Sequence, residues 1–405
     1  MARAVVLAYP THGHIAPILP VVAELVRRGD EVVFYGTGRS RAKIEATGAT
    51  FRAYPRGHDH FNPTPPTEGL FSDMARLAEL TEEMLPQLLE EVRGDAPEYL
   101  LIDTKSLWGR LVGQILGIRT ATLSVVFAIR DGVIPVPHLT SLLYNGAPPE
   151  KLLSGLLGLG DYYESARRLT RQYGTEAPGI VGYLGNPQPL NIIFTSREFQ
   201  VGEEAFGEEF IFTGPSILES RDESTDFPFD RLDGRPLVYI SLGTTFHNAP
   251  AFYRACFEGL GDGPWQVVLS TGGAELDLGE PPANFLVQRY VPQLALLRLA
   301  SVFVTHGGMN SANEGMYFGV PLVVVPQRGD QHMVAARVAQ LSAGVAVGPN
   351  EVSGEALRAA VESVLGNPMF GESVRKLGTS MREAGGYRRA ADSIHSLLVG
   401  HAESA

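Results

Sequence analysis

Cysteine is almost absent from this chain, and other features that would mark particular protein classes are missing too. Cys256 is the only cysteine among 405 residues, so no intrachain disulfide can form and nothing points to secretion. An excess of basic charge is also missing, because the formal net charge is −12. This balance argues against a nucleic-acid partner and against binding to an anionic membrane surface.

The N-terminal region lacks a long apolar run. Its apolar stretch, residues 4–9, is too short for a signal peptide and far too short to span a bilayer. Hydrophobic residues make up 44% of the chain and charged residues 19%, a balance that excludes the disordered and fibrous classes. We therefore expect a cytoplasmic globular protein without stable membrane insertion.

Strand and helix patterns alternate along the whole chain, and a length of 405 residues favours two domains. The apolar runs that predict buried strands in the first half are residues 3–9, 31–35, 50–54, 99–103 and 120–126. The helical patterns between them cover residues 17–28, 40–47, 71–92 and 107–116. The second half repeats this style, with predicted strands near residues 237–241, 266–270, 285–289, 301–304 and 321–325. The alternation predicts an α/β fold with two doubly wound parallel sheets, each covered by helices on both faces.

A polar segment, ESRDESTDFPFDRLDGR at 219–235, separates the two halves. It is rich in Asp, Glu, Ser and Arg and contains Pro228 and Gly234, which is typical of an exposed linker. A surface loop inside one domain is the alternative. We therefore expect an N-terminal domain over 1–218 and a C-terminal domain over 236–385.

A strand, a glycine turn and a helix are predicted around the sequence THGGMNSANEG at 305–315. Residues 301–304 suit a buried parallel strand, and the glycines after His306 turn the chain where side chains would obstruct a ligand. Asn310 and Ser311 fall in the first turn of the following helix. Unpaired backbone N–H groups and the helix dipole favour a diphosphate at that position.

Further polar residues follow at the same edge of the predicted sheet. Glu314 lies one turn along the helix and shares a face with Asn310, so its carboxylate is placed to accept hydrogen bonds from ribose hydroxyls. The next predicted strand, 321–325, is followed by Asp330 and Gln331. They stand at the carboxyl edge of the sheet, where α/β proteins bind ligands.

This run resembles the nucleotide-sugar signature of the family-1 inverting glycosyltransferases, which have the two-domain GT-B fold. It is most similar to the bacterial macrolide-type UDP-glycosyltransferases, with RYVPQ at 289–293 and DQHM at 330–333. The resemblance implies two Rossmann-like domains facing a central cleft, with the acceptor on the first and the donor on the second. It also implies that the last helix, within 386–405, crosses back to the N-terminal domain.

The resemblance assigns roles to individual donor-site residues. It gives the donor diphosphate to His306, Asn310 and Ser311, and the ribose to Glu314. Tyr290 stands where the family usually has tryptophan, and its ring offers a face to the nucleobase. The full set implied to bind the donor is Ser241, Gly243, Thr244, Tyr290, Val291, Gln293, His306, Gly308, Asn310, Ser311, Glu314, Asp330 and Gln331. The last two members of this set are implied to hold hydroxyls of the transferred sugar.

Three segments each keep two interpretations. Residues 241–245, SLGTT, suit a turn near the diphosphate or a purely structural turn closed by a serine or threonine hydroxyl. The histidines in 58–60 flank an aspartate, but nothing nearby completes a metal-ligand set, which favours a solvated loop. The Pro-, Gly- and Leu-rich segment 130–161 suits a mobile lid over an apolar acceptor or ordinary helix and loop packed on the core.

A histidine and an aspartate are predicted to meet in the first domain. His14 follows the first strand, in the sequence PTHGHIAP, and Asp103 ends the fourth. In the common strand order 3-2-1-4-5, strands one and four are neighbours, which places both residues at one ligand-binding crevice. A carboxylate beside a histidine fixes its tautomer and stabilises the imidazolium formed on proton uptake. His12 is a nearby competitor for this role, and capping of the next helix is an alternative role for Asp103.

These features together predict an inverting hexosyltransferase that moves a sugar from a UDP- or dTDP-sugar to a hydroxyl of a small, largely apolar natural product such as a macrolide, polyketide or phenolic. The nucleotide sugar is a co-substrate. No cofactor is implied, and no metal either, since no DxD-type cluster lies near the signature. Alternatives are a sugar-nucleotide 2-epimerase, a MurG-like transferase acting on a membrane lipid carrier, and a non-enzymatic small-molecule binding protein. The oligomeric state stays open.

Overall fold

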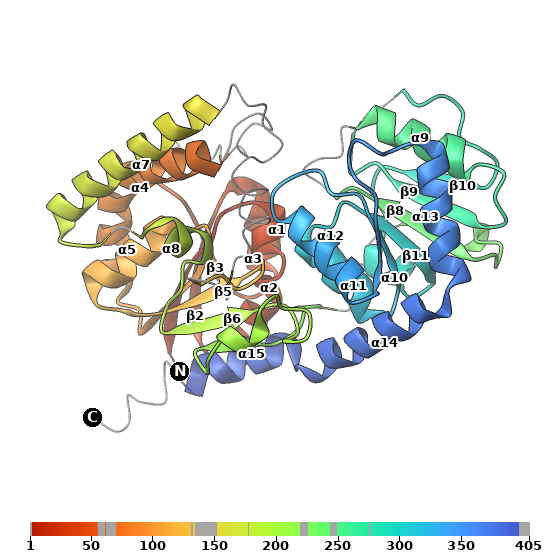
Figure 1. The fold of residues 1–405 in the computed structure, drawn as a ribbon. Coiled ribbons are helices and arrows are strands. Elements are labelled where there is room, and N and C mark those ends of the chain that lie inside the picture. Colours follow the sequence, from red (N-terminus) through yellow and green to blue (C-terminus); the bar gives the residue numbers. More distant parts are fainter. Residues whose placement is uncertain are drawn as a thin grey trace. The chain divides into compact units, whose positions relative to one another are not determined.

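The structure, a computed structural model, describes residues 2–55, 61, 70–130, 133, 152–176, 178–218, 226–243, 249–274 and 277–396. Its contacts divide the chain into two units (Figure 1). Unit 1 comprises Met1–Ser216 together with Ala384–Ala405, and unit 2 comprises Ile217–Glu383. Each unit is built around its own parallel sheet, as the alternating strand and helix patterns predict.

Unit 1 contains a sheet of seven parallel strands in the order β3-β2-β1-β4-β5-β6-β7. The strands are β1 (Arg3–Leu7), β2 (Glu31–Gly36), β3 (Thr50–Ala53), β4 (Tyr99–Asp103), β5 (Arg119–Ser124), β6 (Leu190–Ile193) and β7 (Phe210–Phe212). The predicted order of the first five strands is confirmed. β6 and β7 were not predicted, because strands this short carry little periodic signal.

Helices cover both faces of this sheet. The helices of unit 1 are α1 (His12–Ile15), α2 (Leu19–Arg27), α3 (Arg41–Glu45), α4 (Leu70–Asp95), α5 (Leu107–Leu116), α7 (Leu152–Tyr173), α8 (Ile180–Gly185) and α15 (Gly386–Ile394). Short 3-10 turns lie at Gly38–Ser40 and Glu203–Ala205. The predicted helix over 17–28 is shorter in the structure, where its main part is α2.

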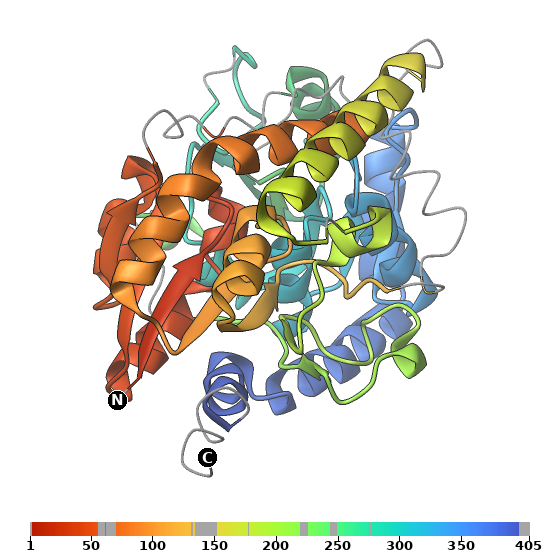
Figure 2. The same ribbon diagram turned by 90° about the vertical axis from the view of Figure 1, so that its left-hand side faces the viewer.

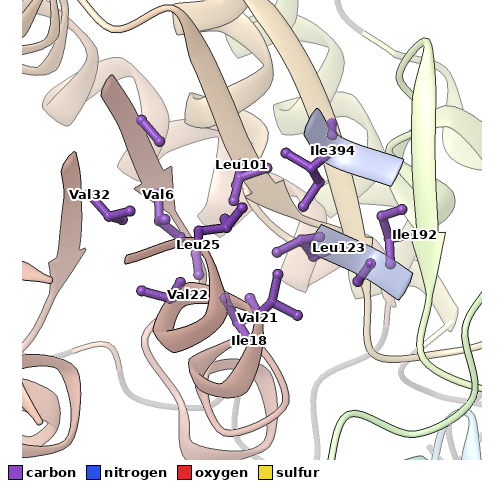
Figure 3. Close-up of a cluster of buried hydrophobic side chains, with 14 of the residues drawn as sticks. Val6, Ile18, Val21, Val22, Leu25, Val32, Leu101, Leu123, Ile192 and Ile394 are labelled. Atoms are coloured by element: carbon purple, nitrogen blue, oxygen red, sulfur yellow. The ribbon is translucent and has the colours of Figure 1, made fainter. Parts of the chain in front are cut away.

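One face of the sheet packs on α2 and α15 (Figure 3). Alternate residues of neighbouring strands supply the apolar side chains, as the two-residue period of a strand requires. The labelled members of this core are Val6, Ile18, Val21, Val22, Leu25, Val32, Leu101, Leu123, Ile192 and Ile394. The C-terminal helix α15 is therefore part of the core of unit 1.

The opposite face carries α4, α5 and α7, and Figure 2 shows α4 and α7 side by side. Gly158 of α7 lies so close to α4 that an added Cβ would stand 2.9 Å from the main-chain carbon of Phe71. Tyr162, one turn further along α7, is fully buried in this core. Leu159 and Tyr162 of α7 therefore pack on the core, whereas Leu157 is exposed. Residues 131–132 and 134–151 of the predicted lid lie outside the described residues.

Asp30 links α15 to the strands of unit 1. Its Oδ2 lies 2.6 Å from His395 Nε2 and accepts a hydrogen bond from the Tyr99 hydroxyl at 2.7 Å, while Oδ1 accepts one from the Ala2 N–H at 3.1 Å. Burial raises the pKa of Asp30, but the hydrogen bonds outweigh it and hold the pKa below its ordinary value of 3.8. The charged carboxylate therefore stabilises the fold.

Replacing Asp30 with asparagine is expected to lower the free energy of unfolding by about 1–3 kcal/mol at pH 7, because a buried charged acceptor is lost. A depressed folded-state pKa gives a contribution that is present above the unfolded-state pKa and is lost as pH falls through the folded-state pKa. The difference in melting temperature between wild type and variant should therefore shrink below about pH 4. Glu31→Gln, which removes an exposed carboxylate on the next residue, is the control. A difference independent of pH would contradict this account.

Unit 2 contains six parallel strands in the order β10-β9-β8-β11-β12-β13. They are β8 (Leu237–Ser241), β9 (Gln266–Ser270), β10 (Phe285–Gln288), β11 (Ala300–Thr305), β12 (Leu322–Val324) and β13 (Gly344–Ala346). The helices are α9 (Pro250–Leu260), α10 (Gln293–Leu297), α11 (Met309–Tyr317), α12 (Gln331–Gln340), α13 (Gly354–Gly366) and α14 (Pro368–Glu383). α9 and α13 pack on one face of this sheet, and α11 packs on the other against Phe303 and Leu322. β13, a strand of three residues, was not predicted.

The described part of the predicted linker is anchored on unit 2. Phe227 is buried there, and a 3-10 turn covers Phe229–Arg231. The Gln266 side chain accepts a hydrogen bond from the Asp233 N–H at 2.9 Å. Residues 219–225 lie outside the described residues. None of the helices in the described part of the chain is both long enough and apolar enough to cross a membrane.

Candidate active site

Asp103 ends β4 and is completely buried. Its Oδ2 accepts a hydrogen bond from the backbone N–H of Tyr9 at 2.9 Å, and its Oδ1 accepts one from the N–H of Lys105 at 2.8 Å. The amide of Asn186 donates to the Asp103 main-chain carbonyl at 3.0 Å. Because β1 and β4 are neighbours in the sheet, the segments after both strands converge on this one carboxylate.

His14 is in contact with this carboxylate. Its Nδ1 lies 2.8 Å from Asp103 Oδ2. Because a carboxylate accepts hydrogen bonds, Nδ1 carries the proton in the neutral imidazole and Nε2 keeps the lone pair. The His14 side chain is 16% exposed, whereas that of Asp103 is 0% exposed. Solvent therefore reaches the imidazole but not the carboxylate.

The local setting of His14 differs from the prediction. The sequence places it in a turn before the first helix, but the structure places it inside the short helix α1, and α2 begins only at Leu19. Pro20 lies in the first turn of α2, where its missing N–H costs no hydrogen bond. The helical pattern is therefore divided between α1 and α2. The predicted meeting of His14 and Asp103 does not depend on this detail.

Exposure and helix capping distinguish these residues from their competitors. His12 is exposed, whereas His14 is partly buried against Asp103. The helix after Asp103, α5, is capped by Ser106, whose hydroxyl accepts a hydrogen bond from the Gly109 N–H at 3.3 Å. Asp103 is therefore not the cap of that helix.

Tyr9 packs edge-on against His14, with ring centroids 5.5 Å apart and planes at 69°. The Trp108 ring neighbours that of Tyr9, with centroids 6.4 Å apart and planes at 36°. Lys105 Nζ stands 5.4 Å from the centre of the Tyr9 ring and 3.0 Å from Asp73 Oδ2. These groups restrict the orientation of the imidazole. Sequence reasoning missed them, although Tyr9 directly precedes the histidine turn and Lys105 follows Asp103 by two residues.

In unit 2, the imidazole of His306 lies between two glycines. A Cβ on Gly243 would stand 2.8 Å from His306 Cε1, and one on Gly308 would stand 2.4 Å from Nε2. Gly243 also has a φ of +74°, which other residues rarely adopt. Both glycines are therefore required by the close approach of the ring. Gly307, which has a φ of +79°, makes the turn that the sequence predicts after β11.

His306 is a neutral and incompletely bonded group. Burial lowers its pKa to about 4, an effect that hydrogen bonding to the Ser241 backbone only partly opposes. Its buried Nδ1 has no hydrogen-bond partner among the described residues. An unpaired buried polar atom is costly. A hydrogen bond from this nitrogen to a bound ligand would therefore be stabilising.

The helix α11 begins at Met309, as predicted, with Gly308 as its N-cap residue. Asn310 and Ser311 occupy its first turn and are partly exposed. Glu314 is buried in the second turn, where its Oε2 accepts a hydrogen bond from Gln293 Nε2 at 2.6 Å. The structure thus brings the predicted diphosphate and ribose residues together with Gln293.

Tyr290 follows β10 and is 62% exposed. Its hydroxyl lies over Gly273, where an added Cβ would stand 2.1 Å away. Val291, the next residue, is partly buried. Most of the Tyr290 side chain is therefore accessible to solvent.

Gln331 and Ser241 have structural partners that the sequence did not reveal. Gln331 Oε1 accepts hydrogen bonds from the N–H groups of Gln327 at 2.8 Å and Arg328 at 3.1 Å, which leaves its amide NH2 as the group able to meet a sugar hydroxyl. The Ser241 hydroxyl accepts a hydrogen bond from the Gly243 N–H at 3.2 Å, which is the structural turn given as the alternative above.

Of the remaining predicted positions, the structure describes Asp330 but not Thr244 or residues 58–60. Asp330 is partly exposed at the start of α12. In the part of the chain that is described, no group of three His, Cys, Asp or Glu side chains is arranged to hold a metal ion.

Residues 233–383 match the family model described as UDP-glucoronosyl and UDP-glucosyl transferase. The uncharacterized UDP-glucosyltransferase YojK of Bacillus subtilis is 35% identical over 412 residues, which cover 100% of both chains. This chain belongs to the family-1 glycosyltransferases. The oleandomycin glycosyltransferase of Streptomyces antibioticus is 28% identical over 98% of this glycosyltransferase and 91% of its own chain.

A solved structure agrees with this family. The glycotransferase of kitacinnamycin has a TM-score of 0.82 and 28% sequence identity, covering 98% of this chain and 99% of its own. The glycosyltransferase therefore has the GT-B fold, with two Rossmann-like α/β domains, as the resemblance implied. It is accordingly a hexosyltransferase.

Proposed function

We propose that this glycosyltransferase transfers a sugar from a nucleoside-diphosphate sugar, UDP- or dTDP-linked, to a hydroxyl of a small and largely apolar natural product, with inversion at the anomeric carbon. The acceptor is assigned to unit 1 and the donor to unit 2. The observation that carries the proposal is the contact of His14 Nδ1 with the buried carboxylate of Asp103. It fixes the tautomer in which His14 Nε2 keeps its lone pair and can act as a base.

In the proposed reaction, His14 Nε2 takes the proton of the acceptor hydroxyl as the acceptor oxygen attacks the anomeric carbon. The bond from that carbon to the diphosphate oxygen breaks on the opposite face, so the configuration inverts and the electron pair leaves with the diphosphate. Asp103 stabilises the imidazolium that forms. The proton and the negative charge thus end on His14 and on the nucleoside diphosphate.

The leaving diphosphate is assigned to the N-terminal turn of α11 and to His306. Backbone N–H groups of the first turn of a helix and the positive end of its dipole favour a phosphate there. The neutral ring of His306, with its unpaired buried Nδ1, supplies a further hydrogen-bonding group. Charge on the leaving group is then stabilised by groups already in place before the reaction.

Treatment with EDTA is expected to leave the rate of transfer unchanged, because this diphosphate site uses backbone and imidazole groups in place of a cation. The initial rate should be measured with and without chelator and again with added magnesium or manganese. Dependence on either metal would contradict the assignment. A metal-dependent transferase assayed in the same buffers is the control for chelation.

Tyr290→Ala is expected to raise the donor dissociation constant by about tenfold or more, because base stacking on an aromatic ring is worth roughly 1–3 kcal/mol. The melting temperature of the unliganded protein should change little, since Tyr290 is 62% exposed. Tyr290→Trp should keep or improve donor affinity, because an indole offers more stacking area. Calorimetry and thermal melts on the same variants test both. A lower melting temperature with unchanged affinity would show a packing role.

The nature of the acceptor rests on relatives. The oleandomycin and kitacinnamycin enzymes named above are similar to this chain over nearly its full length, which favours a natural-product acceptor. These relatives give no support to the 2-epimerase or to a MurG-like transferase. Intact His14 and Asp103 argue against a protein that only binds its ligand.

The proposal is tested by a donor screen followed by an acceptor screen. Calorimetry with UDP and dTDP sugars identifies the donor, and mass spectrometry of mixtures with macrolide, polyketide and phenolic acceptors detects a product heavier by one sugar. Conversion of the donor alone would favour an epimerase. Pelleting with liposomes would favour a lipid-carrier acceptor. Absence of binding to every nucleotide sugar would overturn the proposal.

A further inference from the structure

Glu314 is the last member of a chain of hydrogen bonds that begins in the sheet of unit 2. The hydroxyl of Tyr239, in β8, donates to Gln293 Oε1 at 2.9 Å. Gln293 Nε2 in turn donates to Glu314 Oε2 at 2.6 Å. The exposed fractions of Tyr239 and Glu314 are 1% and 6%, so both ends of the chain are shielded from competing water.

Chemistry fixes the direction of every bond in this chain. A carboxylate only accepts, so the group of Gln293 that faces Glu314 must be the amide NH2. The amide oxygen of Gln293 then faces Tyr239 and requires a donor, which the phenol O–H provides. Without that O–H, the amide oxygen of Gln293 would lose its donor, and the contact with the Glu314 carboxylate alone would hold the Gln293 side chain. In the reversed orientation, the amide oxygen would face the carboxylate.

Tyr239 is itself held in one place. It lies in the third residue of β8, whose neighbours in the sheet are β9 and β11. Its ring stacks on that of Phe303 in β11, with centroids 4.7 Å apart and planes at 5°. The sheet and the stacked Phe303 ring thus hold the Tyr239 hydroxyl in place, whereas Gln293 belongs to the short helix α10.

We propose that Tyr239 is a positioning residue that acts through Gln293 to hold the Glu314 carboxylate for the 2′-hydroxyl of the donor ribose. The donor site would thereby select ribonucleoside diphosphates over 2′-deoxyribonucleoside diphosphates, and so UDP over dTDP among the two proposed donors. This inference rests on the proposed function, because it requires a nucleoside diphosphate at α11. A carboxylate offers about four lone-pair sites, so accepting from Gln293 leaves capacity for a ribose hydroxyl. A site built to bind a hydroxyl disfavours the analogue that lacks it, since its polar groups then lose a partner.

The experiment compares UDP with 2′-deoxy-UDP by calorimetry on the full-length protein. The two ligands carry the same base and diphosphate, so the ratio of their dissociation constants reports the 2′-hydroxyl alone. Wild type should bind UDP more tightly by about tenfold or more, and Glu314→Ala should bring the ratio close to one. Tyr239→Phe should reduce the ratio several-fold by weakening UDP binding while 2′-deoxy-UDP binding changes little.

Tyr253→Phe is the matched control. Tyr253 is also fully buried in unit 2, and its hydroxyl has no hydrogen-bond partner among the described residues. Its removal should leave the ratio unchanged. A thermal melt of each variant shows that it is folded, and general damage to the unit would weaken both ligands equally and so leave the ratio intact.

The outcomes separate the inference from the proposed function. Equal binding of the two ligands to wild type, or an unchanged ratio in Tyr239→Phe, would overturn the role of Tyr239 and leave the donor site standing. Failure of wild type to bind either ligand would overturn the donor site itself, and the inference with it.

Discussion

His14→Ala is expected to reduce the rate of sugar transfer by about 10²–10⁴-fold, because the variant lacks the base that takes the acceptor proton. Donor affinity should stay close to that of wild type, since the donor is assigned to unit 2. Initial rates at saturating donor and acceptor, together with donor calorimetry, measure the two effects separately. His14 is only 16% exposed, but its ring is not part of an apolar core cluster, so the fold should survive the change.

His12→Ala is the matched control, because His12 is an exposed histidine on the same short helix. It should transfer sugar at nearly the wild-type rate. Near-normal turnover in His14→Ala would refute the assignment of the base. Loss of activity in both variants alike would point to damage of α1 as a whole.

Asp103→Asn is expected to lower the rate by about 10³–10⁴-fold, by analogy with the aspartate of a catalytic triad. The amide removes the charge that balances the imidazolium. It also leaves one acceptor oxygen in place of two. This matters because the N–H groups of Tyr9 and Lys105 donate to different oxygens of the carboxylate. In either orientation of the amide, one buried donor meets an NH2 group, so stability should fall as well.

The loss of stability is separated from the loss of catalysis by Asp30→Asn. That variant also removes a buried carboxylate of unit 1, but one that contacts His395 and Tyr99 instead of His14. It should melt at a lower temperature and still transfer sugar when assayed below that temperature. If Asp103→Asn kept most of its activity, Asp103 would be a structural residue only.

Parts of the fold followed from local pattern. Tyr99–Asp103 and Leu107–Leu116 have the predicted bounds, because a continuous apolar run and a capped amphipathic helix are strong local signals. Short strands such as Phe210–Phe212 and Gly344–Ala346 were not predicted. Their position depends on pairing with a neighbouring strand, which no window of sequence contains.

The candidate site also has features that follow from local sequence pattern and contacts that depend on tertiary packing. The residue types and spacing of 305–315 indicated the donor site, because a glycine turn and a helix start are local features. His14 and Asp103 are 89 positions apart, and the strand order made their meeting predictable. The contacts of Lys105 with Asp73 and Tyr9 had no such guide, because they involve side chains from α4 and from the ends of β1 and β4.

The α/β class, the resemblance to the family and most of the elements that carry the predicted site residues were predictable from the sequence alone, since each depends on short-range pattern and residue type. The short helix that carries His14 was not predicted. Only the tertiary structure decided which atoms meet. It placed Nδ1 of His14 on Asp103 and thus set the free nitrogen as Nε2, and it joined Tyr239 to Glu314 through Gln293. It also placed the partly buried ring of His306 between Gly243 and Gly308, and desolvation keeps that imidazole neutral. Hydrogen-bond direction and burial arise from packing between distant segments, and a linear pattern does not encode either one explicitly.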